Sequence, residues 1–340
     1  MAKPLRIAVM WRPGRNIEWQ KRFTQSDIPD DSMEEASLHR DALSEAGHDA
    51  FLVRWDSSRP ATSISELRQR QTDLVFNASS LEEVTSLEAH GIPYCGSGLD
   101  LVALDKAGRK KILAFHGIPT APFVVIDRLP VPGRNIVGID SIRSSWKPVL
   151  PLSYPLFVKP VRGRGSAGVT DDSIVTNNED LYSAAHAIIS RLGQATLVES
   201  YVRGREVTVG VFGNPATVMP PLEIEYNRAR TNSFDHKKDN EIMHCPARLD
   251  PAVMERVKIE ALNTFEALGA RDFGRIDTMV TDDGTPWVLE INTFAGLQML
   301  TGQEKHLHAS YMGMMARRMG MTRSDLLGTI VEAARARYGI

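Results

Sequence analysis

The sequence is poor in cysteine, with only Cys95 and Cys245 among its 340 residues. Two thiols allow one bridge at most, which excludes the small secreted proteins that several disulfides hold together. No charged segment followed by an apolar core opens the chain, and no run reaches the ~18 apolar residues of a membrane helix. We therefore expect a cytoplasmic protein that has no membrane partner.

The chain also lacks a strong charge of either sign. Its 40 lysine and arginine residues face 42 aspartate and glutamate residues, so the formal net charge at pH 7 is −2. So small a charge gives no general attraction for nucleic acid, and we expect no nucleic-acid partner. A hydrophobic content of 42% is ordinary for a globular protein, and 340 residues suffice for two or three domains.

The most informative segment is GRIDTMVTDDGTPWVLEINTFAG, residues 274–296. Two apolar, β-prone runs flank the turn signal DDG, which predicts a hairpin. Glu290 and Asn292 are two residues apart and project from one face, which Asp277 can reach from the paired strand. Oxygen ligands without histidine or cysteine suit Mg²⁺ held between carboxylates and nucleotide phosphates. The alternative is an ordinary hairpin with two solvent-facing acids.

A glycine-rich loop lies upstream in FVKPVRGRGSAGVT, residues 157–170. Lys159 ends an apolar run, and the loop after it contains Gly165 and Ser166. Glycine lets backbone N–H groups approach an anion, the serine adds a donor, and the lysine supplies a positive charge. The spacing is not the Walker A pattern, so this loop alone is a weak sign of a phosphate site.

Three further patterns describe the architecture. Residues 196–213 read as a strand ending at Glu199, a short connector through Val202 and a second strand beginning near Glu206. This order of strand, connector and strand is typical of a site that binds adenine. Nearer the N-terminus, apolar runs at 6–11, 50–55, 73–79 and 92–98 and an amphipathic stretch at 34–47 predict a parallel α/β domain. In residues 251–270 we expect a helix whose core face carries Val253, Val257, Ile259, Leu262 and Phe265.

Together with these motifs, residues 32–53, 91–126, 220–227 and 244–250 resemble the ATP-grasp superfamily and, within it, the D-alanine–D-alanine ligases. The order of several independent motifs makes the resemblance specific. It implies an α/β fold with α+β parts, the ATP-grasp fold. In this fold an N-terminal Rossmann-like domain with a parallel sheet is followed by two α+β domains that clasp ATP between them. The expected divisions are the N-terminal domain, residues 1–98, the central ATP-grasp subdomain, residues 99–200, and the C-terminal catalytic subdomain, residues 201–340.

The resemblance also implies roles for individual residues. At ATP it implies Lys106 and Lys159 on the phosphates, Ser166 in the loop that closes over them, Glu199, Ser200 and Val202 around the adenine, and Glu206 at the ribose. As metal ligands it implies Asp277, Glu290 and Asn292, which would hold two Mg²⁺ ions, with Mn²⁺ able to substitute. As catalytic groups it implies Lys159, Arg275 at the transferring phosphoryl group and tetrahedral species, and the Gly296 backbone at the oxyanion.

Several substrate positions depart from the family pattern. In the family, an acidic side chain helps to bind the ammonium group of the first substrate. The corresponding position in this chain is Met33, and Glu34 or Glu35 would take this role if the loop is shifted. The second serine of the glycine-rich loop is Gly165 here. Lys238 is an imperfect stand-in for the lysine that normally covers the substrates. Thr301 replaces the serine that receives the acceptor carboxylate but keeps its hydroxyl.

We therefore predict an ATP-dependent ligase that joins a small-molecule carboxylate donor to an amino-acid acceptor through an acyl phosphate, with an altered first-substrate pocket. One alternative is an ordinary D-alanine–D-alanine ligase of peptidoglycan synthesis. Another is an ATP-binding regulator without turnover, against which the complete catalytic set argues. The resemblance implies a homodimer. The basic and aromatic segment 11–32 is either a specificity lid or a surface insertion or subunit contact.

Overall fold

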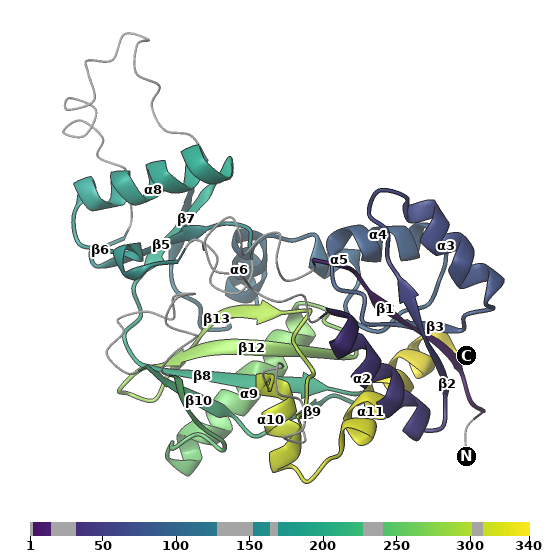
Figure 1. The fold of residues 1–340 in the computed structure, drawn as a ribbon. Helices are drawn as coiled ribbons and strands as arrows, with labels where there is room; N and C mark the ends of the chain where they lie inside the picture. The colour runs from purple at the N-terminus through teal and green to yellow at the C-terminus, as the bar shows by residue number, and fades with distance from the viewer. Residues whose placement is uncertain (1–2, 15–31, 128–151, 164–168, 227–240, 301–308) are drawn as a thin grey trace.

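The computed structural model describes residues 3–14, 32–127, 152–163, 169–226, 241–300 and 309–340. Three sheets carry the fold of these residues (Figure 1). Four residues that the sequence predicts at the substrate or ATP sites, Gly165, Ser166, Lys238 and Thr301, lie outside the described residues, as does most of segment 11–32.

The N-terminal sheet is parallel, as the alternating pattern predicts, with strand order β2-β1-β3. Its strands are β1 (Arg6–Trp11), β2 (Asp49–Arg54) and β3 (Leu74–Phe76), and its helices are α2 (Ser32–Glu45), α3 (Pro60–Gln69) and α4 (Leu81–Ala89). The centre of β1 is fully buried because helices cover both faces of such a sheet. Residues 92–98 form no strand; Tyr94 makes only an isolated parallel bridge to Val75.

The central sheet is antiparallel, with order β4-β7-β5-β6. Its strands are β4 (Phe123–Ile126), β5 (Leu156–Pro160), β6 (Ile174–Val175) and β7 (Thr196–Ser200). The helices α5 (Leu99–Val102) and α6 (Lys106–Phe115) come before it, and the 3₁₀ turn η1 (Asp171–Ser173) and α8 (Asn178–Leu192) lie between β5 and β7 in the chain. In Figure 1, α6 is drawn between this sheet and the elements of the N-terminal sheet.

The C-terminal sheet is the largest, with order β11-β10-β8-β12-β13 and β9 paired to β8. Its strands are β8 (Arg205–Phe212), β9 (Thr217–Val218), β10 (Leu222–Tyr226), β11 (Glu241–His244), β12 (Phe273–Val280) and β13 (Pro286–Asn292). Helix α9 (Pro251–Ala267) covers one face through Val257, Ala261 and Phe265. The expectation that Ile259 belongs to this core is wrong, because its side chain is 48% exposed.

The N-terminal and C-terminal sheets share one hydrophobic core. It combines Ile7 and Leu43 with Ile224 of the C-terminal sheet and with residues of α10 (Tyr311–Arg318) and α11 (Arg323–Tyr338). Helix α11 packs along α2 (Figure 1). The strands of the N-terminal sheet lie before residue 98, those of the central sheet between residues 99 and 200, and those of the C-terminal sheet after residue 200. The division into domains itself stays a prediction.

None of the described helices is long and apolar enough to span a bilayer.

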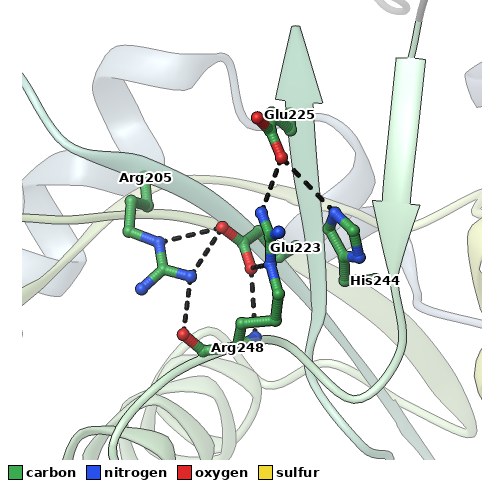
Figure 2. Close-up of polar contacts among 5 residues, drawn as sticks. All are labelled: Arg205, Glu223, Glu225, His244 and Arg248. Carbon is green, nitrogen blue, oxygen red and sulfur yellow. Dashed lines mark hydrogen bonds and ion pairs between the residues drawn. The ribbon is translucent and has the colours of Figure 1, made fainter.

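A network of charged side chains braces the edge of the C-terminal sheet away from the hairpin β12–β13 (Figure 2). Glu223 on β10 accepts hydrogen bonds from Arg205 at 2.7 and 2.8 Å and from Arg248 at 3.0 and 3.3 Å. Glu225 contacts Arg248 at 2.6 Å and His244 at 3.4 Å. Burial on its own raises the pKa of Glu223, but the two arginines outweigh it, and the pKa lies below its ordinary value.

We expect E223Q to lower the free energy of unfolding at pH 7 by about 2 kcal/mol, because a buried charged acceptor is lost. A lowered pKa in the folded state means that the contribution of Glu223 is present above the unfolded value and is lost as pH falls through the folded value. Urea unfolding should therefore show wild type and E223Q converging below about pH 4. The half-exposed Glu225 provides the control E225Q, with a smaller effect. An equal stability deficit of E223Q at pH 7 and pH 3 would contradict this assignment.

Candidate functional site

The hairpin predicted for residues 274–296 is confirmed as β12 and β13. Asp277 pairs with Glu290, and Arg275 pairs with Asn292 in the antiparallel register. An irregularity follows Asp277, where the register shifts by one residue on β13. Directly opposite residues of an antiparallel pair project from the same face, so these four polar side chains line one face of the hairpin.

The Asp277 carboxylate is the centre of this polar face. Arg275 donates to it from Nε at 2.9 Å and from Nη2 at 3.0 Å, which is the bidentate arrangement of an arginine–carboxylate pair. Asn292 donates from Nδ2 at 2.7 Å, and Thr208 of β8 donates from Oγ1 at 2.6 Å. Burial on its own lowers the pKa of Arg275, but Asp277 raises it well above the ordinary value. Arg275 therefore stays positively charged, and its guanidinium group contacts Asp277, two residues further along β12.

Thr208 was not identified from the sequence, and its contact with Asp277 comes from the pairing of β8 with β12. The side chain is fully buried. We expect T208V to lower kcat by about three- to tenfold and stability by about 1 kcal/mol, because one hydrogen bond that orients Asp277 is lost. Steady-state kinetics and urea unfolding measure the two effects. Thr329, exposed on α11, provides the matched control T329V. An unchanged kcat in T208V would mean that Thr208 does not orient Asp277 for the reaction.

Helix α6 brings a lysine to the hairpin. Lys106 is the first residue of the helix, whose N-terminus is capped by Asp105 accepting a hydrogen bond from the Gly108 N–H. Its Nζ donates to the Gly163 carbonyl oxygen at 2.9 Å and lies 3.8 Å from Glu290 Oε2. Burial lowers the pKa of Lys106, and the nearby Glu290 carboxylate offsets part of this effect. A cation and a carboxylate thus meet where α6, the hairpin and the start of the glycine-rich loop converge.

Strands β5 and β7 place a second lysine next to a buried carboxylate. Lys159 Nζ lies 2.6 Å from Glu199 Oε1, and both side chains are less than 10% exposed. Burial on its own lowers the pKa of Lys159, but Glu199 and Glu290 outweigh it, so the pKa is raised and the lysine stays charged. The strand, connector and strand predicted around Glu199 are confirmed as β7, residues 201–204 and β8.

The remaining predicted residues lie as follows. Ser200 ends β7, Val202 is in the connector, and Glu206 is on β8, two residues before Thr208 and therefore on the same face of the sheet. In the first turn of α2, Met33 is 51% exposed whereas Glu35 is 3% exposed. Glu35, rather than Met33, is therefore the residue turned inward there.

Gly296 lies against Ser310 at the start of α10. A Cβ built on Gly296 would come within 2.6 Å of Gln298 Oε1 and 3.1 Å of Ser310 Cβ, so a larger residue forces these groups to shift. The next residue, Tyr311, places its ring 5.0 Å from Arg275 Cζ. Neither Ser310 nor Tyr311 was identified from the sequence, because nothing in the local pattern links α10 to the hairpin.

The hairpin fits a divalent cation in the kind of ligand it offers. Asp277 and Glu290 supply carboxylates, and Asn292, whose Nδ2 is engaged by Asp277, keeps its amide oxygen available. Within the described ranges no three histidine, cysteine, aspartate or glutamate side chains form a metal-binding group. A set of two carboxylates and one amide instead suits Mg²⁺, which takes few protein ligands and completes its shell with water and phosphate oxygens.

The chain is similar to known proteins over most of its length. Residues 112–332 match the sequence family described as D-ala D-ala ligase C-terminus. The D-alanine–D-alanine ligase of Bordetella petrii is 31% identical over 309 residues, which cover 86% of this chain and 84% of that protein. The D-alanine–D-alanine ligase of Bordetella avium is 31% identical over 261 residues, or 73% of this chain and 72% of that protein.

The fold is also similar to a solved structure. The D-alanine–D-alanine ligase of Bacillus anthracis, solved in complex with ATP, superposes with a TM-score of 0.70 at 22% identity and covers 98% of this chain and 99% of its own. This likeness confirms the expected fold class, an ATP-grasp fold with a parallel N-terminal sheet and antiparallel sheets beyond it.

Proposed function

Because this chain belongs to the D-alanine–D-alanine ligase family, we propose that it is an ATP-dependent ligase that forms a carbon–nitrogen bond between a carboxylate donor and an amino-acid acceptor. The observation that carries the proposal is the meeting of Lys106 with Glu290 at 3.8 Å, beside the bidentate pair of Arg275 and Asp277. Helix α6 and the hairpin thereby bring cations and carboxylates together at one site. Such a combination suits the transfer of a phosphoryl group.

The chemistry requires an activated carboxylate, since a carboxylate oxygen is a poor leaving group in water. Transfer of the γ-phosphoryl group of ATP to the donor carboxylate gives an acyl phosphate and ADP. Attack by the acceptor amine then gives a tetrahedral species, which expels phosphate and loses a proton from its nitrogen to leave the amide. Charge on the phosphoryl oxygens and on the tetrahedral oxyanion must be neutralised in both steps.

The residues of the chain supply this neutralisation. Lys106 and Lys159 would bind phosphate oxygens, and Arg275 would stabilise the transferring phosphoryl group and the oxyanion. The N–H of Gly296 would donate to the same oxyanion. Asp277, Glu290 and Asn292 would hold two Mg²⁺ ions, which neutralise charge on the nucleotide phosphates when bound. The homodimer expected from the resemblance stays a prediction.

The identity of the donor is the finer part of the proposal. Gly165 and Met33 replace two polar anchors that the family provides for the first substrate, which supports a donor other than D-alanine. One observation favours the second candidate, an ordinary D-alanine–D-alanine ligase. Glu35 is buried in the first turn of α2 and so offers an inward carboxylate close in sequence to Met33.

Phosphate release separates the two candidates. Purified protein with ATP and Mg²⁺ is tested against D- and L-amino acids and non-amino carboxylates, singly and in pairs, with the product masses measured. The altered-donor proposal expects no turnover with D-alanine alone and turnover with another pair. Turnover with D-alanine alone that yields the dipeptide would overturn it in favour of the ordinary ligase. Phosphate release without any coupled product would contradict the ligase function.

A further inference from the structure

Helix α6 carries a second lysine one turn after Lys106, and this side chain is buried more deeply than the first. Lys110 is 1% exposed. Its ammonium group donates hydrogen bonds to Thr120 Oγ1 at 2.6 Å and to the Ala121 carbonyl oxygen at 3.4 Å, and it forms an ion pair with Glu199 Oε2 at 3.1 Å. Two hydrogen bonds and one ion pair therefore hold the ammonium group in place.

The Glu199 carboxylate is shared between two lysines. Oε1 lies 2.6 Å from Lys159 Nζ, and Oε2 lies 3.1 Å from Lys110 Nζ. Burial on its own raises the pKa of Glu199, but Lys159 and Lys110 outweigh it and keep the pKa below its ordinary value. Glu199 is therefore an anion that only accepts hydrogen bonds, and each of its oxygens keeps a lone pair for another donor.

Lys110 also ties this carboxylate to the hairpin. Thr120, which contacts the Lys110 ammonium, donates from Oγ1 to the Val288 carbonyl oxygen of β13 at 2.9 Å. Glu290 is two residues further along the same strand. One ammonium group thus connects α6, β7 and β13, three elements that carry residues implicated in binding ATP and Mg²⁺.

We propose that Lys110 is a positioning residue that holds Glu199 as the acceptor for the 6-amino group of adenine, and thereby sets the affinity for ATP and the preference for ATP over GTP. The inference rests on the proposed function, because the adenine role of Glu199 comes from the family resemblance. Guanine carries a 6-oxo group, which would place one acceptor against another at a fixed carboxylate. Such a site rejects the wrong base through an unpaired polar contact.

Among the residues that the structure describes, loss of Lys110 leaves Lys159 as the cation paired with Glu199, so the carboxylate can turn toward Lys159. We expect K110M to raise the KM for ATP about tenfold and to lower the ratio of kcat/KM for ATP over GTP by a similar factor, because the acceptor is no longer held in place. The KM for the amino acid should change less than about twofold, since Lys110 contacts none of the groups assigned to it.

A double-mutant cycle separates positioning from general damage. If Lys110 acts through Glu199, K110M in an E199Q background should add less than about twofold to the KM for ATP. The control is K111M, the same change at the neighbouring exposed lysine of α6, which should behave as wild type. T120V, which removes one acceptor of the Lys110 ammonium and keeps the shape of the side chain, should give a smaller shift in the same direction even where K110M folds poorly.

Binding of a non-hydrolysable ATP analogue, measured by calorimetry on the full chain, distinguishes failure of this inference from failure of the proposed function. Wild type that binds the analogue without forming any product overturns the ligase function, and the variants still test Lys110 through their dissociation constants. K110M and T120V that bind the analogue as wild type does, with the same preference over the guanine analogue, would overturn the role of Lys110.

Discussion

Replacing Glu290 with alanine is expected to lower kcat for ATP-dependent phosphate release by at least about 10³-fold, because the charge neutralisation that a bound metal supplies to the phosphates is lost. Glu290 pairs with Asp277 across the hairpin and lies 3.8 Å from Lys106 Nζ. The side chain is 26% exposed, and its removal opens no core cavity. The melting temperature should therefore stay within about 3 °C of wild type.

A matched control separates the site from a general loss of charge. Glu255 on α9 is 64% exposed and forms an ion pair with Lys258 at 3.5 Å, so E255A removes a carboxylate of the same kind away from the hairpin. Its kcat should equal that of wild type. Persistence of phosphate release in E290A at saturating Mg²⁺ would mean that Glu290 is not a metal ligand.

Replacing Arg275 with lysine is expected to lower kcat by about 10²- to 10³-fold, the usual loss when one donor to a developing negative charge is removed. Lysine keeps the charge but not the planar fork that contacts both Asp277 oxygens. A loss on this scale from so conservative a change would show that orientation matters as much as charge. Single-turnover measurements separate the phosphoryl-transfer step from amide formation.

The control for this change is another arginine–aspartate pair close in the sequence. Arg271 Nη2 contacts Asp100 Oδ2 at 2.7 Å at a partly exposed position, so R271K alters the same kind of pair outside the hairpin. We expect its kcat to stay within about twofold of wild type, because surface pairs contribute little. A kcat for R275K within threefold of wild type would rule out a direct role for Arg275 in either step.

The hairpin and the strands around Glu199 were predictable because their signals are local. Alternation and turn residues in a short window specify which side chains share a face, which is how Asp277, Glu290 and Asn292 were grouped correctly. The order β4-β7-β5-β6 has no comparable local signal, because strand pairing depends on contacts between distant segments.

The contacts that orient the site were not predictable for the same reason. Thr208 contacts Asp277 because β8 pairs with β12, and Lys110 on α6 contacts Glu199 on β7. The helical pattern also misplaced Ile259. Val257 lies at the centre of the buried face, and Ile259, two residues later, lies about 200° around the helix from it and is exposed. An apolar residue fits a helical pattern loosely, and the packing partner decides which residues are covered.

The central claim is that the donor carboxylate is activated by phosphorylation, and its oxygen atoms record that step. The donor identified by phosphate release is prepared with ¹⁸O in its carboxylate, and the inorganic phosphate formed during ligation is analysed by mass spectrometry. An acyl phosphate transfers one carboxylate oxygen to phosphate, so we expect one ¹⁸O atom in each phosphate released with product. Phosphate that carries no ¹⁸O while the amide is formed would contradict the mechanism.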